Sequence, residues 1–182
     1  REDGVTRAVE DADIVIGSVP YSLGYTMLEN VIRAGKNIVA ISYFMEDPFG
    51  LDELAKEKGV TAVVDCGVVP GMGNLILGDH SRNMKLDRYE CYVGGVPKSR
   101  KAPLGYKSPF PVLEVLEEYA ESGTMVEAGK VVVKPMLAET KTIDLDKVGT
   151  MACLNSDGLR TLIHTMDIPD MFEKTLRYPN HV

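Results

Sequence analysis

The 182-residue sequence is poor in cysteine and has no long apolar run, and each of these absences excludes a class of protein. Its three cysteines, Cys66, Cys91 and Cys153, are too few and too widely spaced for a disulfide framework or a Cys-x-x-Cys metal site. We therefore expect a reducing, cytoplasmic location. No segment approaches the roughly 18–20 consecutive apolar residues that span a bilayer, and no signal peptide opens the sequence, so we expect no membrane partner.

An excess of positive charge is also lacking. The sequence has 20 lysine and arginine residues against 27 aspartate and glutamate residues, a net charge of −7 at pH 7, which argues against a nucleic-acid partner. His80 and His164 have no cysteine, aspartate or glutamate at metal-ligand spacing, so the sequence predicts no metal site. What remains is an ordinary globular composition, 45% hydrophobic and 26% charged.

The first third of the sequence alternates predicted strands and helices. Three short apolar runs predict buried strands, at Asp13–Ser18, Asn37–Ser42 and Val60–Asp65. Two segments with helical spacing of apolar residues lie between them, at Ser22–Ala34 and Pro48–Lys58, and each is followed by glycine. Strands separated by single helices predict right-handed βαβ units in a parallel sheet.

The pattern changes near Gly73. After a predicted helix over Asn74–Met84, polar and apolar residues alternate, as in strands with one solvent-exposed face. The alternating segments are Asp87–Val93, Lys130–Val133, Thr140–Ile143 and Thr150–Leu154. One more helix is predicted over Val112–Glu121, with an apolar side formed by Leu113, Leu116 and Ala120. The predicted fold class is α/β: part of a parallel sheet in residues 1–73, then an α+β domain with a mixed or antiparallel sheet in residues 74–182.

The parallel part resembles half of a nucleotide-binding domain. Such sheets bind their ligand at the carboxyl ends of the strands, beside a G-x-G-x-x-G loop. That loop is absent from the sequence. The most similar segment, Gly67–Gly73, contains Pro70, and we interpret it as a crossover between domains. The sequence therefore predicts the second half of a Rossmann-type sheet.

Several motifs, taken in order, resemble the saccharopine dehydrogenase-like family, and within it most of all the lysine 6-dehydrogenase branch. The motifs are Asp11–Ile16, Val19–Tyr21, Arg33–Lys36, Asp65–Asn74, Tyr92–Pro97, Pro103–Lys107, Asp157–Leu162 and Glu173–His181. The resemblance implies a nicotinamide-dependent oxidoreductase that acts on a small amino acid and forms a homodimer. It also implies further segments before Arg1 and after His181, so we expect a chain that is truncated at both ends and inactive alone.

Two departures from the family pattern bear on the substrate. Saccharopine reductases carry an aspartate where this sequence has Val69, and an arginine that aligns with Leu113. Saccharopine has an extra dicarboxylate arm, for which an arginine fork is a natural receptor. The resemblance then implies oxidative deamination of L-lysine at its ε-carbon. The alternatives are a saccharopine reductase or carboxynorspermidine-type imine reductase, and a non-catalytic dimerisation module.

The resemblance and the strand ends together name the candidate site. NAD is the expected cofactor, with NADP not excluded. The candidate cofactor-binding residues are Ser18, Val19, Pro20, Tyr21, Ser42 and Gly67. The candidate substrate-binding residues are Tyr43, Asp65, Tyr106, Thr161, Arg177 and Tyr178.

Lys107 is the leading catalytic candidate. A lysine desolvated beside other cations can accept a proton near neutral pH, and a charged one can hold a carboxylate. The alternative is a solvated loop lysine, the commonest fate of this residue type. Arg177 and Tyr178 either fork a substrate carboxylate or belong to a surface strand with an exposed ion pair. Asn74 is expected to cap a helix, and Cys66 to be a small buried hydrophobe.

Overall fold

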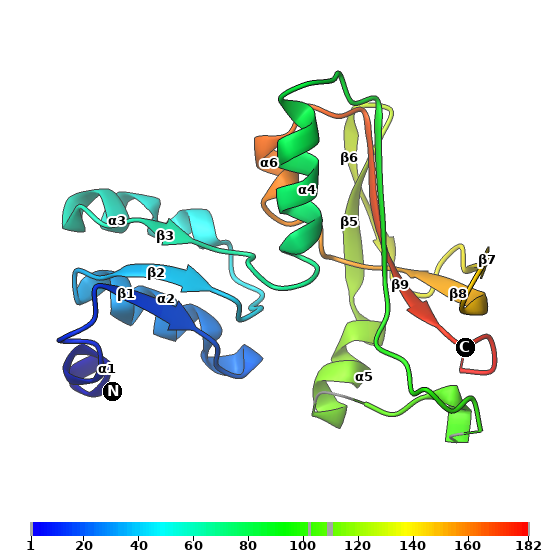
Figure 1. Ribbon diagram of the computed structural model, residues 1–182, viewed down its shortest axis with the longest axis horizontal. Coiled ribbons are helices and arrows are strands. Elements are labelled where there is room, and N and C mark those ends of the chain that lie inside the picture. The colour runs from blue at the N-terminus through cyan, green and yellow to red at the C-terminus, as the bar shows by residue number, and fades with distance from the viewer. Residues whose placement is uncertain (1, 102, 109–110, 182) are drawn as a thin grey trace. The chain divides into compact units, whose positions relative to one another are not determined.

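The computed structural model describes residues 2–101, 103–108 and 111–181, and the chain divides into two compact units, Arg1–Leu75 and Ile76–Val182 (Figure 1). The division falls two residues after the predicted boundary at Gly73. The first unit contains a parallel sheet and the second a mixed sheet, which confirms the predicted fold class.

The first unit is a three-stranded parallel sheet in the order β1-β2-β3. Its strands are β1 (Ile14–Gly17), β2 (Asn37–Ala40) and β3 (Ala62–Val63). Its helices are α1 (Glu2–Ala8), α2 (Gly24–Arg33) and α3 (Asp52–Lys58), with short 3-10 turns η1 (Tyr21–Leu23) and η2 (Pro48–Leu51). The predicted strand over Val60–Asp65 shortens to two residues, because the amide of Val60 bonds back to the end of α3 and that of Thr61 bonds to the side chain of Asn37.

Local signals explain why these helices start and stop where they do. Gly35 and Gly59 follow α2 and α3 with positive φ values of 72° and 64°, a conformation that glycine adopts without steric cost. At the start of η2 the side chain of Asp47 accepts a hydrogen bond from the amide of Phe49. The apolar stripe of α2 then packs on one face of the sheet. The buried core of the unit consists of Leu28, Val31, Ile32, Ile38, Ala40, Phe44 and Leu51.

The second unit is built on a six-stranded sheet. It follows α4 (Met72–Ser81), and the strand order is β6-β5-β9-β8-β7, with β4 pairing parallel to β9. The strands are β4 (Arg88–Val93), β5 (Ser122–Glu127), β6 (Lys130–Pro135), β7 (Lys141–Leu145), β8 (Gly149–Asn155) and β9 (Asp170–Arg177). The helices are α5 (Val112–Ala120) and the short α6 (Leu162–Thr165), with the 3-10 turn η3 at Pro103–Gly105.

Two strands of this sheet, β5 and β9, lie outside the strands that alternation predicted. β9 is central, and its alternate residues from Met171 to Arg177 point to the side of the sheet where α4 and α6 pack. There Met171 joins Leu77 of α4 and Leu162 of α6 in a buried cluster. The opposite side of β7, β8 and β9 has its own buried cluster, made of Met151, Cys153, Leu176 and Tyr178.

The apolar side predicted for α5 is exposed and does not face the sheet. Leu113 and Leu116 are 66% and 60% exposed, whereas Val115 is buried. Glu118 and Tyr119 of the same helix contact β9 instead. The helix therefore turns a mixed polar and aromatic face to the sheet, because a buried arginine on β9 needs partners there.

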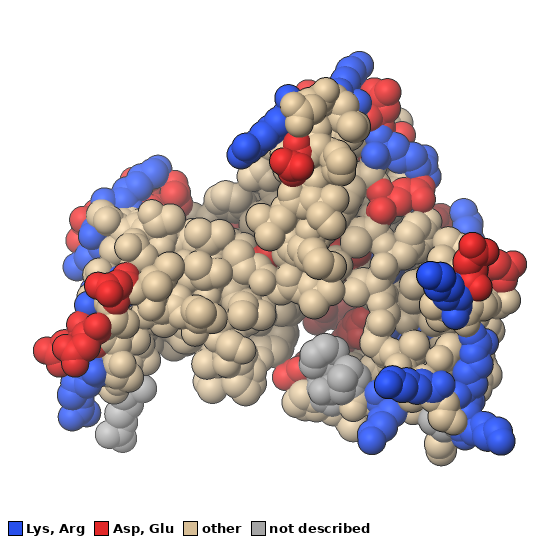
Figure 2. Space-filling view, in the orientation of Figure 1, with Lys and Arg blue, Asp and Glu red and all other residues tan. Residues whose placement is uncertain are grey.

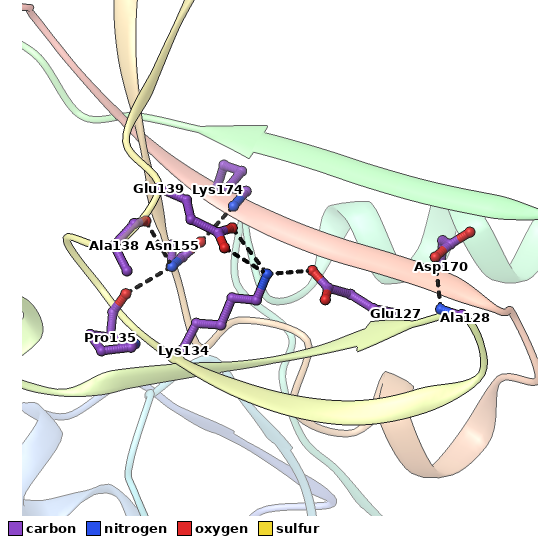
Figure 3. A network of polar contacts seen from close by, with 9 residues as sticks. All are labelled: Glu127, Ala128, Lys134, Pro135, Ala138, Glu139, Asn155, Asp170 and Lys174. Atoms are coloured by element: carbon purple, nitrogen blue, oxygen red, sulfur yellow. Dashed lines mark hydrogen bonds and ion pairs between the residues drawn. The ribbon is translucent and has the colours of Figure 1, made fainter.

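A buried asparagine fixes the connection between β6 and β7 (Figure 3). The amide nitrogen of Asn155, at the end of β8, donates to the carbonyl oxygens of Pro135 at 2.8 Å and Ala138 at 3.1 Å. Its Oδ1 accepts from Nζ of Lys174 at 2.5 Å. Both hydrogens of the side-chain amide and its oxygen therefore have partners within the protein, which indicates a structural role for Asn155.

Charged side chains extend this network (Figure 3). Nζ of Lys134 lies 2.6 Å from Glu127 and 3.0 Å from Glu139. Burial lowers the pKa of Lys174, and the carboxylate of Glu139 opposes that effect. The group links the β6–β7 connection to β5 and β9 and lies on the side of the sheet away from Arg177.

Candidate functional site

In the first unit, the loop after β1 is held by a single serine of the next strand end. Oγ of Ser42 accepts a hydrogen bond from the amide of Val19 at 2.8 Å and donates one to the carbonyl of Val19 at 2.9 Å. The amides of Ile41 and Ser42 both point to the carbonyl of Gly17. Ser42 is buried, so its hydroxyl shapes the loop from beneath.

The surface that this loop presents is apolar and aromatic. Tyr21 and Tyr43 stack with ring centroids 6.1 Å apart and planes 13° from parallel, and both rings are half-buried. Ser18 and Pro20 are exposed next to them. Flat apolar groups at the carboxyl edge of a parallel sheet fit the planar ring of a nicotinamide cofactor. The phosphates of such a cofactor need a glycine loop, which this sequence lacks, so these residues would hold only its nicotinamide end.

The third strand end carries Asp65, Cys66 and Gly67. Asp65 is buried with a φ of 55°, and the amide of Cys66 bonds to the carbonyl of Ala40 in β2. Burial, and secondarily the carboxylate of Asp65, raises the pKa of the Cys66 thiol. A raised pKa lowers the fraction of reactive thiolate, and Cys66 is half-buried where the sequence predicted a buried residue.

The crossover after β3 is tightly folded. Gly67 and Gly71 form an isolated bridge across the cis Val69–Pro70 peptide, and a Cβ on Gly71 would overlap the backbone of Gly67. Asn74 accepts a hydrogen bond from the amide of Gly71 at 3.3 Å, from a position inside the first turn of α4. It does cap the helix, but from two residues inside it, because the helix begins at Met72.

In the second unit, Arg177 of β9 is the centre of a buried polar group. It is only 5% exposed. Its Nη2 donates to both carboxylate oxygens of Glu118, at 3.0 and 3.3 Å, and its Nε donates to the hydroxyl of Tyr119 at 2.8 Å. Its Nη1 donates to the carbonyl of Leu176 at 3.0 Å. The interpretation of Arg177 as part of a surface strand is therefore wrong, and the carboxylate that it forks belongs to the protein.

Aromatic rings enclose this arginine. The guanidinium lies 4.8 Å from the ring centroid of Tyr106 and 5.8 Å from that of Tyr119, while the ring of His181 lies 4.6 Å from Tyr106. Nε2 of His181 is 2.7 Å from the hydroxyl of Tyr119. Burial raises the pKa of Tyr119, against the opposing effect of Arg177, so its hydroxyl stays protonated. We call these five residues the arginine cluster: Tyr106, Glu118, Tyr119, Arg177 and His181.

Lys107 directly follows the arginine cluster in the η3 loop and is exposed. Its amine makes no hydrogen bond or ion pair to any residue that the structure describes. Exposed Lys98, Arg100 and Lys101 precede η3, and Figure 2 shows lysine and arginine side chains gathered around this part of the second unit. Such a local positive field favours carboxylate ligands, although the chain as a whole is acidic.

Tyr178 and Thr161 do not join the arginine cluster. Tyr178 is buried on the other side of β9, where its hydroxyl donates to the carbonyl of Pro97 at 2.9 Å and Arg100 lies over its ring at 4.4 Å. Thr161 precedes α6 and gives it no side-chain cap. α6 has only four residues, and Arg160 before it has a φ of 38°. Of the predicted substrate-binding residues, Tyr43 and Asp65 belong to the first unit. In the second unit only Tyr106 and Arg177 come together, and Thr161 and Tyr178 lie apart from them.

Sequence reasoning missed Glu118 and Tyr119 as members of the arginine cluster. Both lie on α5, whose exposed leucines suggested a different inward side. Their spacing could have indicated this, since residues three and four positions after Val115 lie on the same face of the helix. Of the residues that the structure describes, none form a group of three metal-binding side chains, and no helix among them is long and apolar enough to cross a membrane.

Comparisons with known proteins show what this chain is similar to. The saccharopine dehydrogenase C-terminal domain family matches residues 63–182. A saccharopine dehydrogenase (NADP(+), L-glutamate-forming) of Pyricularia oryzae is 32% identical over 126 residues, which cover 65% of this chain and 28% of that protein. The enzyme of the same name from Schizosaccharomyces pombe is 30% identical over 138 residues, 72% of this chain and 31% of that protein.

The fold also has a solved counterpart. Apo saccharopine dehydrogenase (L-Glu forming) from Saccharomyces cerevisiae matches with a TM-score of 0.72 over 99% of this chain and 43% of that one, at 23% identity. At this identity the likeness shows a shared fold. The chain spans less than half the length of each of these relatives.

Proposed function

The chain belongs to the saccharopine dehydrogenase C-terminal domain family, and from that membership we propose that the protein is a nicotinamide-dependent oxidoreductase acting on the amine carbon of an amino acid. The observation that carries the proposal is the loop after β1, which Ser42 clamps at the carboxyl edge of a parallel sheet. Relatives at 30% and 32% identity are named as NADP(+)-dependent enzymes, which supports a nicotinamide cofactor of either kind.

In the proposed reaction each candidate residue has a role in cofactor binding, substrate binding or proton transfer. When bound, the cofactor accepts a hydride from the carbon that bears the amine. Val19, Pro20 and Tyr21 border the nicotinamide, Ser42 holds their loop, and Ser18 and Gly67 complete that edge. The substrate nitrogen loses a proton as its carbon–nitrogen double bond forms, and water then hydrolyses the imine to an aldehyde and ammonia. Lys107 either accepts that proton or holds the substrate carboxylate.

Lysine is the substrate that we propose. Where saccharopine reductases carry an arginine, this chain has Leu113, which lies in an exposed apolar row with Val112 and Leu116. A charge-assisted contact to a second substrate carboxylate, worth about 1.5–3 kcal/mol, is therefore not available from this position. Saccharopine is the second candidate, and the names of the relatives favour it.

Steady-state rates with the two substrates test the proposal. The full-length protein is assayed with NAD or NADP and either L-lysine or saccharopine, and the reduced cofactor is followed by its absorbance. We expect kcat/KM for lysine to exceed that for saccharopine by roughly tenfold or more, the ratio that corresponds to about 1.4 kcal/mol. The reverse order would assign saccharopine, and inactivity with both would refute the oxidoreductase proposal.

A lysine pair tests the role of Lys107. Lys107→Met should lower kcat/KM by roughly 100-fold if the amine transfers a proton, and less if it only binds a carboxylate. Lys98→Met is the matched control, because Lys98 is also exposed and lies in the same basic segment. Equal activity of the two variants would show that Lys107 has no part in the reaction.

A homodimer is also part of the proposal. The outward side of β4 carries exposed Arg88, Glu90 and Tyr92, and a second copy could cover it. Sedimentation of the full-length protein should give twice the monomer mass, and a monomer would contradict this part. Cys66, Cys91 and Cys153 are all unpaired, which supports the predicted cytoplasmic location.

A further inference from the structure

The backbone just before Lys107 has a conformation that needs outside support. Leu104 has a φ of 54° and Gly105 a φ of 57°, two successive left-handed residues. A leucine rarely adopts this conformation, and such backbone persists only where surrounding groups determine it. Lys107 follows two residues later, so whatever holds this turn also sets the direction in which the lysine leaves the loop.

The chain segment after β9 supplies that support. Nδ1 of His181 lies 3.1 Å from the carbonyl oxygen of Leu104, and the side chain of Asn180 lies so close to Gly105 that a Cβ there would overlap it. The ring of Tyr106 stands next, 4.6 Å from the ring of His181. The loop therefore meets the end of the chain at three consecutive residues.

The ring of His181 has a polar neighbour at each nitrogen. A carbonyl can only accept, so Nδ1 carries the hydrogen that bonds to Leu104. Nε2 lies 2.7 Å from the hydroxyl of Tyr119, which also accepts from Nε of Arg177. Both ring nitrogens are thus used, and the ring cannot rotate without breaking a contact.

We propose that His181 is a positioning residue for Lys107: it transmits the fixed orientation of buried Arg177, through Tyr119, to the turn that presents Tyr106 and Lys107. The proposal rests on the proposed function for the role of Lys107, but the link between the end of the chain and the η3 loop stands on geometry alone. The contacts bring together parts of two motifs that are far apart in the sequence, since residues 104–106 contact Arg177, Asn180 and His181.

Three variants of the full-length protein test this. His181→Ala removes both hydrogen bonds and the ring, whereas His181→Asn keeps a donor near the position of Nδ1 for the carbonyl of Leu104. His80→Ala is the control, because His80 is an exposed histidine on α4. We expect His181→Ala to raise KM for the amine substrate about tenfold without changing KM for the cofactor, and His181→Asn to recover most of that loss.

Hydrogen–deuterium exchange separates this inference from the proposed function. In His181→Ala the amides of residues 104–108 should exchange about tenfold faster, while those of β9 keep their protection. This readout needs no activity, so it decides the positioning role even if no amine substrate is turned over. Unchanged exchange in residues 104–108 would overturn the inference, as would an equal rise throughout the second unit, because either result removes the specific link to the loop.

Discussion

Replacing Arg177 with methionine distinguishes a structural arginine from a substrate-binding one. Methionine keeps much of the apolar contact with Tyr106 and Tyr119 but removes the charge and all donors. If Arg177 stabilises the second unit through Glu118, the variant loses stability. If the arginine instead binds a substrate carboxylate, stability changes little and KM rises. Measuring both the free energy of unfolding and KM for the substrate therefore distinguishes the two roles.

The contacts of Arg177 set the expected magnitude. Breaking a buried ion pair by removing one partner costs about 3–5 kcal/mol. The side chain of Glu118 is 31% exposed, so water rehydrates its carboxylate in the variant and the cost falls to the lower end of that range. The lost bonds to Tyr119 and the carbonyl of Leu176 add about 1 kcal/mol each, and retained packing offsets part of this. We expect a loss of about 3–4 kcal/mol.

Urea unfolding of the full-length protein, followed by circular dichroism, measures this loss. Arg33→Met is the matched control, because Arg33 makes an exposed ion pair with Glu29 one helical turn away on α2. That pair should contribute no more than about 0.5 kcal/mol. If Arg177→Met also stays within about 0.5 kcal/mol of the unmodified protein, the structural interpretation is refuted, and a raised KM would then identify a substrate ligand.

Three further changes have definite expected results. Asn155→Ala removes the hydrogen bonds to the carbonyls of Pro135 and Ala138 and should cost about 1–3 kcal/mol in the same urea experiment; a cost below about 0.5 kcal/mol would contradict the network of Figure 3. Ser42→Ala frees the loop at Val19, so cofactor affinity measured by calorimetry should fall several-fold, and unchanged affinity would remove Ser42 from the site. Burial and the carboxylate of Asp65 raise the pKa of Cys66, so a smaller fraction of its thiol is ionised than in a free cysteine at the same pH. Iodoacetamide should therefore alkylate it slowly at pH 8 and faster as pH rises, and Asp65→Asn should speed the reaction modestly, since burial is the larger cause; a rate equal to that of free cysteine would refute this.

The sequence predicted the first unit well because its signals are local. Each strand is a continuous apolar run, although Ile14, Ile16 and Val63 are exposed and the prediction that these strands are buried is wrong for those residues. The two predicted helices are each followed by a glycine with positive φ, Gly35 and Gly59. The helix over Pro48–Lys58 begins in η2 and continues through α3 with Leu51 buried, as predicted. No long-range contact has to be known to place these elements.

The second unit resisted prediction where polar residues are buried. β5 starts at Ser122, directly after the extended Glu121 that ends α5, so no turn residue marks its beginning. β9 reads as a polar segment because Glu173, Thr175 and Arg177 occupy its covered side, yet they are 3%, 6% and 5% exposed. Alternation assumes that the covered side of a strand is apolar, and here that assumption fails.

The failure on β9 is itself informative about the site. A strand that served only to fill a core would continue the pattern that Met171 begins, because burying a charge is costly unless it is paired. Instead the covered side becomes polar from Glu173 onward and ends in Arg177, whose partners come from α5 and from Tyr106 after η3. Family resemblance identified Tyr106 and Arg177 separately but not their contact, which joins residues 71 positions apart (177 − 106). Local rules of sequence are expected to fail where a protein has residues for chemistry rather than for folding. In this chain they fail at the arginine cluster, next to Lys107. We expect substitution of the buried Arg177 to lower stability, and substitution of the exposed Lys107 to change substrate turnover without changing the fold.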